Sequence, residues 1–198
     1  MAKFKVAVIV GSLRKDSMNL KLAKALEKLG QDKFETKFLQ IGSLPLYNQD
    51  LEENFPSEVA AIKKEIMAAD AVLFVTPEYN RGVPGPLKNA IDWCSRPYGQ
   101  NAFAGKPAAI CGASPGAIGT ACAQSALKHT FTYLELITMG QPEVYLNFTE
   151  GLIDKDGNIS KEETKKFLQK FTDKFADWIG QVGKAGRQNK SQDNSQAA

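Results

Sequence analysis

The chain has 198 residues, of which 43% are hydrophobic and 24% are charged. This composition fits one globular domain and excludes a collagen, a coiled coil and a wholly disordered chain. Lysine and arginine number 25 against 22 acidic residues, and the longest basic runs stay below four residues. There is thus no electrostatic reason to expect a nucleic acid or an anionic membrane as partner, and small molecules are the better-supported ligands.

Cysteine usage and hydrophobic runs indicate the compartment. Cys94, Cys111 and Cys122 are scattered and form no CxxC pair, so a reduced, cytoplasmic protein is predicted rather than a disulfide framework. The apolar stretch at 6–10 is too short for a signal peptide. No apolar run approaches the roughly 18 residues that a transmembrane helix needs.

The first predicted element is a strand over residues 4–10, a valine-rich run that ends at Gly11 and suits a strand buried on both faces of a parallel sheet. Further strands are predicted over 34–41, 71–76 and 107–111, with 142–146 as a candidate fifth. Helical apolar spacing lies between them, at 20–29, at 59–69 after a candidate cap at Ser57, and at 87–94. This alternation predicts an open parallel sheet with helices on both faces.

The last predicted helix begins at a capping box formed by Ser160 and Glu163, and an apolar stripe continues from Phe167 to Val182. The segment 183–198 has no apolar residue larger than alanine and cannot offset its ordering entropy, so it is expected to be disordered. The predicted organisation is therefore one domain over 1–182 followed by a polar tail over 183–198.

In an open α/β sheet, ligands bind beyond the carboxyl ends of the strands, so the loops that follow the strands are the candidate sites. The first loop, residues 11–19 (GSLRKDSMN), offers hydroxyls, a carboxamide, a guanidinium and the free N–H groups of a helix start, which suit a phosphate monoester. It matches neither GxxxxGK[ST] nor GxGxxG. The alternative is that Ser17 or Asn19 merely caps the helix and that Arg14 lies in solvent.

Two more loops are unusual. Residues 76–86 (TPEYNRGVPGP) combine three prolines with two glycines, which makes either a stiff loop that presents backbone groups to a planar heterocycle or an ordinary rigid connection. Residues 112–119 (GASPGAIG) contain three glycines, but their spacing is not that of the dinucleotide fingerprint.

Taken together, GSLRKDSMN, TPEYN with VPGPLKNAIDW, and GASPGAIG resemble the NADPH-dependent FMN reductase family, in particular its chromate, quinone and azo reductase branch, over about residues 4–182. The resemblance implies a flavodoxin-like three-layer α/β sandwich with a parallel five-stranded sheet of order 2-1-3-4-5. It also implies FMN as cofactor, NADPH or NADH as electron donor, and a homodimer or homotetramer. The FMN-binding residues it implies are Ser12, Leu13, Arg14, Ser17, Met18 and Asn19 in the first loop, Pro77, Glu78, Tyr79 and Asn80 in the second, and Ala113, Ser114, Pro115 and Gly116 in the third.

The resemblance implies hydride transfer from NAD(P)H to bound FMN, followed by transfer of two electrons to a quinone, chromate, azo or similar acceptor in a ping-pong mechanism. This chemistry needs no side-chain nucleophile or general base, so no catalytic residue is predicted. The alternatives are a flavodoxin-type electron carrier, although such carriers tend to be acidic and this chain has a pI of about 8.6, and a module that senses or sequesters flavin. NADPH oxidation with an added quinone separates them.

Arg81 stands where the family often has an aromatic residue, and Gly82 and Thr120 also depart from its pattern. We hypothesise that Arg81 and Arg96 form a substrate-binding pair that draws anionic acceptors or the NADPH phosphate to the flavin. The alternative is that they are surface or subunit-contact residues.

Two other possible functional sites, a Cys/His pair and a calcium loop, are better explained by structural roles. His129 lies seven residues after Cys122, too far along one helix for a Cys/His pair, and is interpreted as a solvent or interface residue. Residues 152–163 imitate a calcium loop, but Leu152 holds the first ligand position, so an Asp-Gly turn is predicted and no metal is expected.

Overall fold

The computed structural model describes the backbone of residues 2–196 and the side chains of residues 2–183. Its centre is a parallel sheet of order β2-β1-β3-β4-β5, in which β6 also pairs with β4. The strands are β1 (Phe4–Val10), β2 (Phe34–Leu39), β3 (Ala71–Val75), β4 (Pro107–Ser114), β5 (Ile137–Thr138) and β6 (Val144–Asn147). The predicted strand order is confirmed.

The fifth position of the sheet is divided between two short strands. Ile137 pairs with Pro107 at the beginning of β4, and Val144 pairs with Cys111 further along it. The candidate strand over 142–146 therefore corresponds to β6, shifted by two residues at its start, whereas the two-residue β5 was too short to produce a recognisable apolar run.

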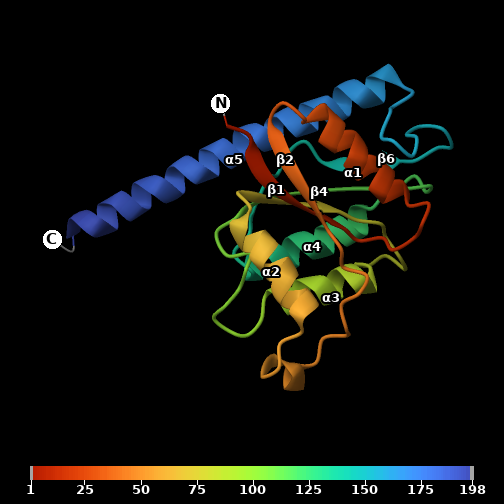
Figure 1. Ribbon diagram of the computed structural model, residues 1–198. Coiled ribbons are helices and arrows are strands. Elements are labelled where there is room, and N and C mark those ends of the chain that lie inside the picture. Colours follow the sequence, from red (N-terminus) through yellow and green to blue (C-terminus); the bar gives the residue numbers. More distant parts are fainter. Residues whose placement is uncertain (1, 197–198) are drawn as a thin grey trace.

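Helices cover both faces of the sheet, with α1 and α5 on one side and α2, α3 and α4 on the other (Figure 1). Their bounds are α1 (Met18–Leu29), α2 (Ser57–Ala68), α3 (Gly85–Cys94), α4 (Ala121–Tyr133) and α5 (Glu162–Gln196), and a short 3₁₀ helix η1 spans Gln49–Glu52. In β1, Val6 and Val8 belong to the core under α1 and α5, whereas Ala7 and Ile9 belong to the opposite core. Because side chains alternate along a strand, a nearly all-apolar run is what two buried faces require.

Two of the predicted helix starts are wrong in detail. The N-cap of α2 is Pro56, and the Ser57 hydroxyl donates to its neighbour Glu58 at 3.2 Å instead of capping the helix. Helix α5 begins at Glu162, and the Ser160 hydroxyl donates to the Leu152 carbonyl at 3.3 Å. In both places, the serine hydroxyl is a donor to a neighbouring group, and its oxygen does not accept from a first-turn N–H as an N-cap would.

Helix α5 buries most of the predicted apolar stripe, with Leu168, Phe171, Phe175 and Ile179 in the core, whereas Phe167 at its start is exposed. The side chains of residues 184–198 lie outside the described part of the chain, so the disorder predicted for 183–198 stays a prediction. Within the described residues, no helix is both long and apolar enough to cross a membrane.

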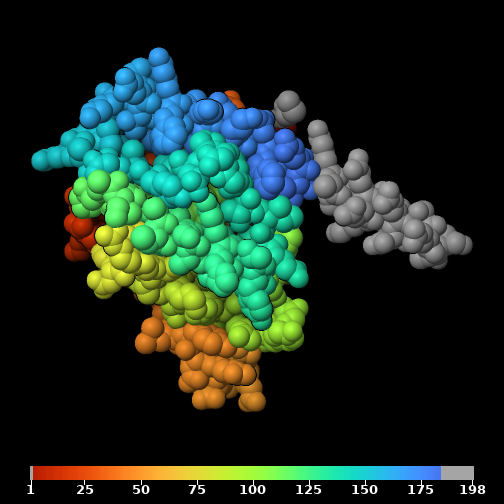
Figure 2. Space-filling model, turned by 180° about the vertical axis from the view of Figure 1, so that it is seen from behind, coloured from red at the N-terminus to blue at the C-terminus, as the bar shows by residue number. Residues whose placement is uncertain are grey.

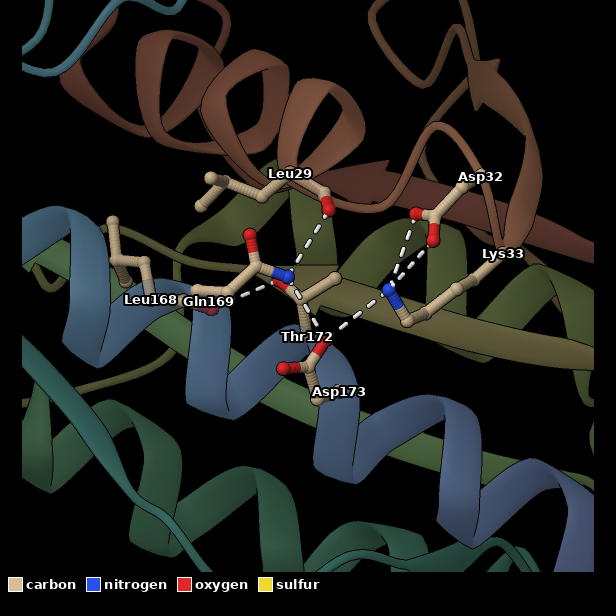
Figure 3. A network of polar contacts seen from close by, with 7 residues as sticks. All are labelled: Leu29, Asp32, Lys33, Leu168, Gln169, Thr172 and Asp173. Carbon is tan, nitrogen blue, oxygen red and sulfur yellow. Dashed lines mark hydrogen bonds and ion pairs between the residues drawn. The ribbon is translucent and has the colours of Figure 1, made fainter.

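Polar contacts join α5 to the end of α1 (Figure 3). The Gln169 side-chain amide donates to the Leu29 carbonyl at 3.2 Å, and Lys33 lies 3.3 Å from Asp173. Lys33 also pairs with Asp32. These exposed ion pairs add little stability beside the apolar stripe.

Candidate functional site at the strand ends

The loops that follow β1, β3 and β4 lie side by side because these strands are parallel neighbours in the sheet. The Gly11 N–H donates to the Val75 carbonyl at 2.9 Å, and the Thr76 N–H donates to the Cys111 carbonyl at the same distance. The backbone hydrogen bonds between neighbouring strands thus continue to the residue at which each strand leaves the sheet. The three motifs singled out in the sequence consequently meet at one edge, where ligands of open α/β sheets bind.

The first loop leads into the N-terminus of α1. Ser17 is the N-cap and accepts from the Leu20 N–H at 3.1 Å, and the first turn contains no acidic residue. Asp16, just before the cap, pairs with Lys21 at 2.5 Å, and this hydrogen bond lowers the pKa of the Asp16 carboxyl. The first-turn N–H groups that the cap leaves free, with the half-buried Ser12 and the exposed Arg14, form a donor set that fits a phosphate monoester.

The side chain of Asn19, one of the residues that the resemblance places at the FMN phosphate, is engaged within the protein. Its carboxamide donates to the Ala113 carbonyl and accepts from the Ala113 N–H, both at 2.9 Å, in a buried setting. The side chain therefore ties the start of α1 to the end of β4. The backbone N–H of Asn19 lies in the first turn of α1 and can still donate to a phosphate.

The second loop is held at both ends of its PEYN motif. The carboxylate of Glu78 accepts from the Ala123 N–H at 2.9 Å and so caps the N-terminus of α4. Tyr79 and Gly82 then pair across a tight turn, with the Gly82 N–H donating to the Tyr79 carbonyl at 2.9 Å.

The residues at the tip of this turn have left-handed backbone conformations. Asn80 has φ 51° and Arg81 has φ 62°, the arrangement of a type I′ turn. Glycine usually holds the second of these places, so Arg81 carries backbone strain that glycine would not. The Tyr79 side chain is 52% exposed beside it.

The third loop is braced by the chain that follows β6. The Ser114 carbonyl accepts from the Phe148 N–H at 2.8 Å, and the Pro115 carbonyl accepts from the Asn147 side-chain amide at 3.1 Å. Pro115 and Gly116 are exposed, whereas Ala113 is buried and its backbone is occupied by Asn19. The backbone of the half-buried Ser114 and of the exposed Pro115 is thus held in place by these hydrogen bonds.

Sequence reasoning missed the residues that support this loop. A Cβ at Gly112 would lie 2.1 Å from the Thr120 hydroxyl oxygen and 2.3 Å from the Thr76 carbonyl, so only glycine fits there. The buried Gln124 amide donates to the Thr120 hydroxyl and to the Val144 carbonyl, each at 2.8 Å. A glutamine within the small and apolar stretch 121–127 was the available signal.

The two predicted substrate-binding arginines lie at opposite ends of α3. Arg81 precedes this ten-residue helix and Arg96 follows it, a separation of about 15 Å along the axis. Arg96 lines a cavity of about 380 Å³ together with Tyr98 and Tyr133. The joint role of the two arginines in substrate binding stays a prediction.

The remaining sequence candidates have surface and turn positions. His129 is exposed on α4. Asp154 accepts from the backbone N–H groups of Asp156 and Asn158, at 2.9 and 2.8 Å, as an Asp-Gly turn requires. Among the described residues, no cluster of three or more potential metal ligands occurs.

Comparison with known proteins decides the family. The family model for NADPH-dependent FMN reductase matches residues 4–151, well over half of the chain. The chain belongs to this family. The predicted flavodoxin-like fold, FMN cofactor and NAD(P)H donor are thereby confirmed, as is the prediction of an enzyme rather than an electron carrier.

Similar proteins agree with this membership. A 2-hydroxy-1,4-benzoquinone reductase from Burkholderia sp is 54% identical over 175 residues, which cover 88% of this chain and 96% of that protein. A quinone reductase from Pseudomonas putida is 49% identical over 177 residues, covering 89% and 95%. The solved structure of FerB from Paracoccus denitrificans, a flavoenzyme NAD(P)H:(acceptor) oxidoreductase, has a TM-score of 0.87 and 50% identity over 90% of this chain and 98% of that one.

Proposed function

We propose that this FMN reductase family member is an NAD(P)H-dependent reductase of small quinones that works by two alternating half-reactions at the strand-end site. The observation that carries the proposal is the meeting of a phosphate-type donor set with two braced loops at one sheet edge. The names of the Burkholderia and Pseudomonas relatives support a quinone as acceptor. When bound, FMN supplies the capacity to take a hydride from a nicotinamide and to give two electrons to an acceptor.

In this proposal, the protein binds FMN and orients the donor and acceptor molecules against it. Ser12, Arg14, Ser17 and the first-turn N–H groups of α1 hold the phosphate. Leu13 and Met18 contribute side-chain contact from the same loop. Because no proton-transferring side chain is invoked, catalysis here rests on positioning the donor and acceptor rings against the cofactor.

The other two loops line the ring system from opposite sides. Residues 77–80 hold one edge, and residues 113–116 hold the other. Glu78 and Asn19 are engaged within the protein, so their contribution is to keep these loops at a fixed spacing. Two loops held at a fixed spacing would favour flat acceptors over bulky ones.

Arg81 is proposed to favour anionic acceptors. Its guanidinium is exposed at the tip of a turn whose left-handed backbone is costly for arginine, and such strain is commonly retained where a side chain has a function. A hydroxyquinone is a vinylogous acid and is anionic at neutral pH, so its approach would be favoured by this charge. A neutral benzoquinone would be indifferent to it.

The first experiment is an absorption spectrum of the purified protein, followed without oxygen on addition of NADPH and then of 1,4-benzoquinone. Flavin bands that bleach and return support the proposal. A colourless protein that oxidises NADPH only with added FMN would make FMN a substrate instead. Absence of NADPH oxidation in both conditions would contradict the proposed activity.

Arg81→Gly tests the acceptor preference, because glycine keeps the left-handed turn and removes only the side chain. We expect kcat/KM for 2-hydroxy-1,4-benzoquinone to fall about tenfold while that for 1,4-benzoquinone changes by less than about twofold. Arg81→Lys restores most of the preference. Arg96→Gln, measured in parallel with chromate and NADPH, tests the second predicted arginine, and unchanged Michaelis constants would remove Arg96 from the proposal.

The proposal extends to features that are carried by the family resemblance. Chromate and azo compounds are secondary acceptors, the chain assembles as a homodimer or homotetramer, and it works in the cytoplasm. Free Cys94, Cys111 and Cys122 agree with a reducing compartment. Light scattering of the flavin-loaded protein measures the assembly directly.

A further inference from the structure

A cavity of about 740 Å³ lies along α2, where η1 and the loop after α3 approach that helix. None of its lining residues belongs to the three strand-end loops. The segment between β2 and α2, which carries one wall of the cavity, projects from the body of the molecule (Figure 2). Much of the lining is apolar, including Phe55, Met67 and Pro97. Volume and lining are those of a small-molecule site.

Lys63 is the unusual residue in the wall of this cavity. It is only 8% exposed, and its ammonium group donates to the carbonyls of Arg96 and, at 3.0 Å, of Gln100. The nitrogen lies 5.2 Å from the centre of the Phe55 ring. An ammonium group has three donors, and these carbonyls use two of them.

Lys63 is a buried cation without a carboxylate partner. Among the described residues, the ion pairs involve other lysines. The acid that also lines the cavity, Glu52, accepts from the Tyr47 hydroxyl at 2.7 Å. Burial lowers the pKa of the Lys63 ammonium, and the negative charge of Glu52 offsets this effect only in part. Buried charges are ordinarily paired, so an anion that entered the cavity would supply the ion-pair partner that Lys63 lacks.

We propose that the α2 cavity binds a small aromatic molecule with one acidic group. Its anion would lie at the Lys63 ammonium, and its ring would pack against Phe55, Met67 and Pro97. Lys64, which is exposed and also lines the cavity, adds a second positive charge. The site is separate from the proposed flavin site and does not depend on its chemistry.

The test uses the flavin-loaded full chain and two probes of the same ring, 2-naphthoate and the neutral 2-naphthylmethanol. Isothermal titration calorimetry is expected to give a dissociation constant of about 1 mM or tighter for the acid, as a small ligand of modest efficiency would have. The neutral alcohol should bind at least about tenfold more weakly, because it lacks the charge that Lys63 requires.

Two variants locate the binding. Lys63→Met removes the charge and keeps an unbranched apolar side chain, and it should weaken naphthoate binding about tenfold or more. Lys64→Met is the matched control and should weaken binding by less than about threefold, since exposed charges are screened. Ala60→Glu, at an exposed helical position in the cavity wall, keeps Lys63 in place, supplies a competing carboxylate and should also abolish binding.

Several results would overturn the proposal. One is equal binding of the acid and the alcohol, and another is the absence of saturation at about 10 mM. Naphthoate that competes with quinone and loses affinity in Arg81→Gly rather than in Lys63→Met would be bound at the flavin site. If Lys63→Met and Ala60→Glu change the oligomeric state while naphthoate does not bind, a second copy of the chain covers the cavity instead.

Discussion

The carboxamide of Asn19 and the backbone of Ala113 exchange two hydrogen bonds of 2.9 Å between the start of α1 and the end of β4. These residues lie 94 positions apart in the sequence, and strand β3 separates β1 from β4 in the sheet. One buried side chain thus sets the spacing between the phosphate-type loop and the loop that would flank the ring. The geometry of the proposed flavin site depends on a residue that need not touch the flavin with its side chain.

Asn19→Ala should therefore affect stability and cofactor binding together. The substitution leaves a buried N–H and a buried C=O without partners, which costs about 2–4 kcal/mol in the free energy of unfolding. Urea unfolding of the FMN-free protein measures this loss, and quenching of FMN fluorescence measures the weaker binding. Asn147→Ala, which removes one exposed hydrogen bond to Pro115, should cost less than about 1 kcal/mol and serves as control. Equal effects of the two variants would contradict the special position of Asn19.

Glu78→Ala should destabilise the start of α4. The carboxylate accepts from the Ala123 N–H near the positive end of the helix, and loss of such a cap costs about 1 kcal/mol. Glu78→Gln keeps an acceptor oxygen and should recover at least half of the loss. Urea unfolding gives the stabilities, and circular dichroism checks that helix content is retained. If the alanine and glutamine variants are equally unstable, charge rather than the hydrogen bond carries the effect.

Glu135→Gly should stabilise the protein. Glu135 follows the C-terminal end of α4 at φ 58°, and the Leu136 N–H donates to the Phe131 carbonyl at 3.0 Å, as in a Schellman motif. Glycine adopts this conformation without strain, so the free energy of unfolding should rise by about 0.5–1 kcal/mol. Glu135→Ala retains the Cβ and should give no gain. Thermal unfolding of the three proteins side by side is the measurement.

The buried thiols should make the protein less stable at alkaline pH. Burial raises the pKa of the Cys94 thiol to about 12 and also raises that of Cys111. Above pH 9.0, the unfolded thiol ionises while the folded thiol stays protonated, so the unfolded state binds fewer protons and stability falls as pH rises. Each thiol contributes at most about 1.4 kcal/mol per pH unit. Cys94→Ala should flatten this decline in pH-dependent urea unfolding.

The same burial predicts thiol reactivity. In the native protein at pH 8, a disulfide reagent such as dithiobis(nitrobenzoate) should react with the half-buried Cys122 and leave Cys94 and Cys111 unmodified. All three should react in denaturant. Mass spectrometry of the native adduct identifies the site, and modification of Cys111 before unfolding would show that β4 opens locally.

The sequence by itself determined the alternation of apolar strands and amphipathic helices, and hence the parallel sheet. It also determined at which edge of the sheet, the carboxyl ends of the strands, the candidate site lies. Those signals are local, because a strand with two buried faces must be apolar at every position whatever it packs against. It also determined the family, since three loop motifs stand in the right order on the right strands. The helix caps at Ser57 and Ser160 were wrong, because a serine in the sequence pattern does not reveal whether its oxygen will lie within reach of a first-turn N–H.

Only the tertiary structure decided what the loop residues do. Asn19 reaches a backbone distant in sequence, Glu78 caps a helix that follows the next strand, and Gly112 makes room for Thr120. Likewise, Lys63 donates to the backbone of the loop after α3 and lies beside Phe55, contacts that its place in the sequence does not reveal. Such roles arise from contacts between segments that are far apart along the chain. The identity of a polar residue in the sequence does not show which hydrogen-bond partner it will have in the folded protein.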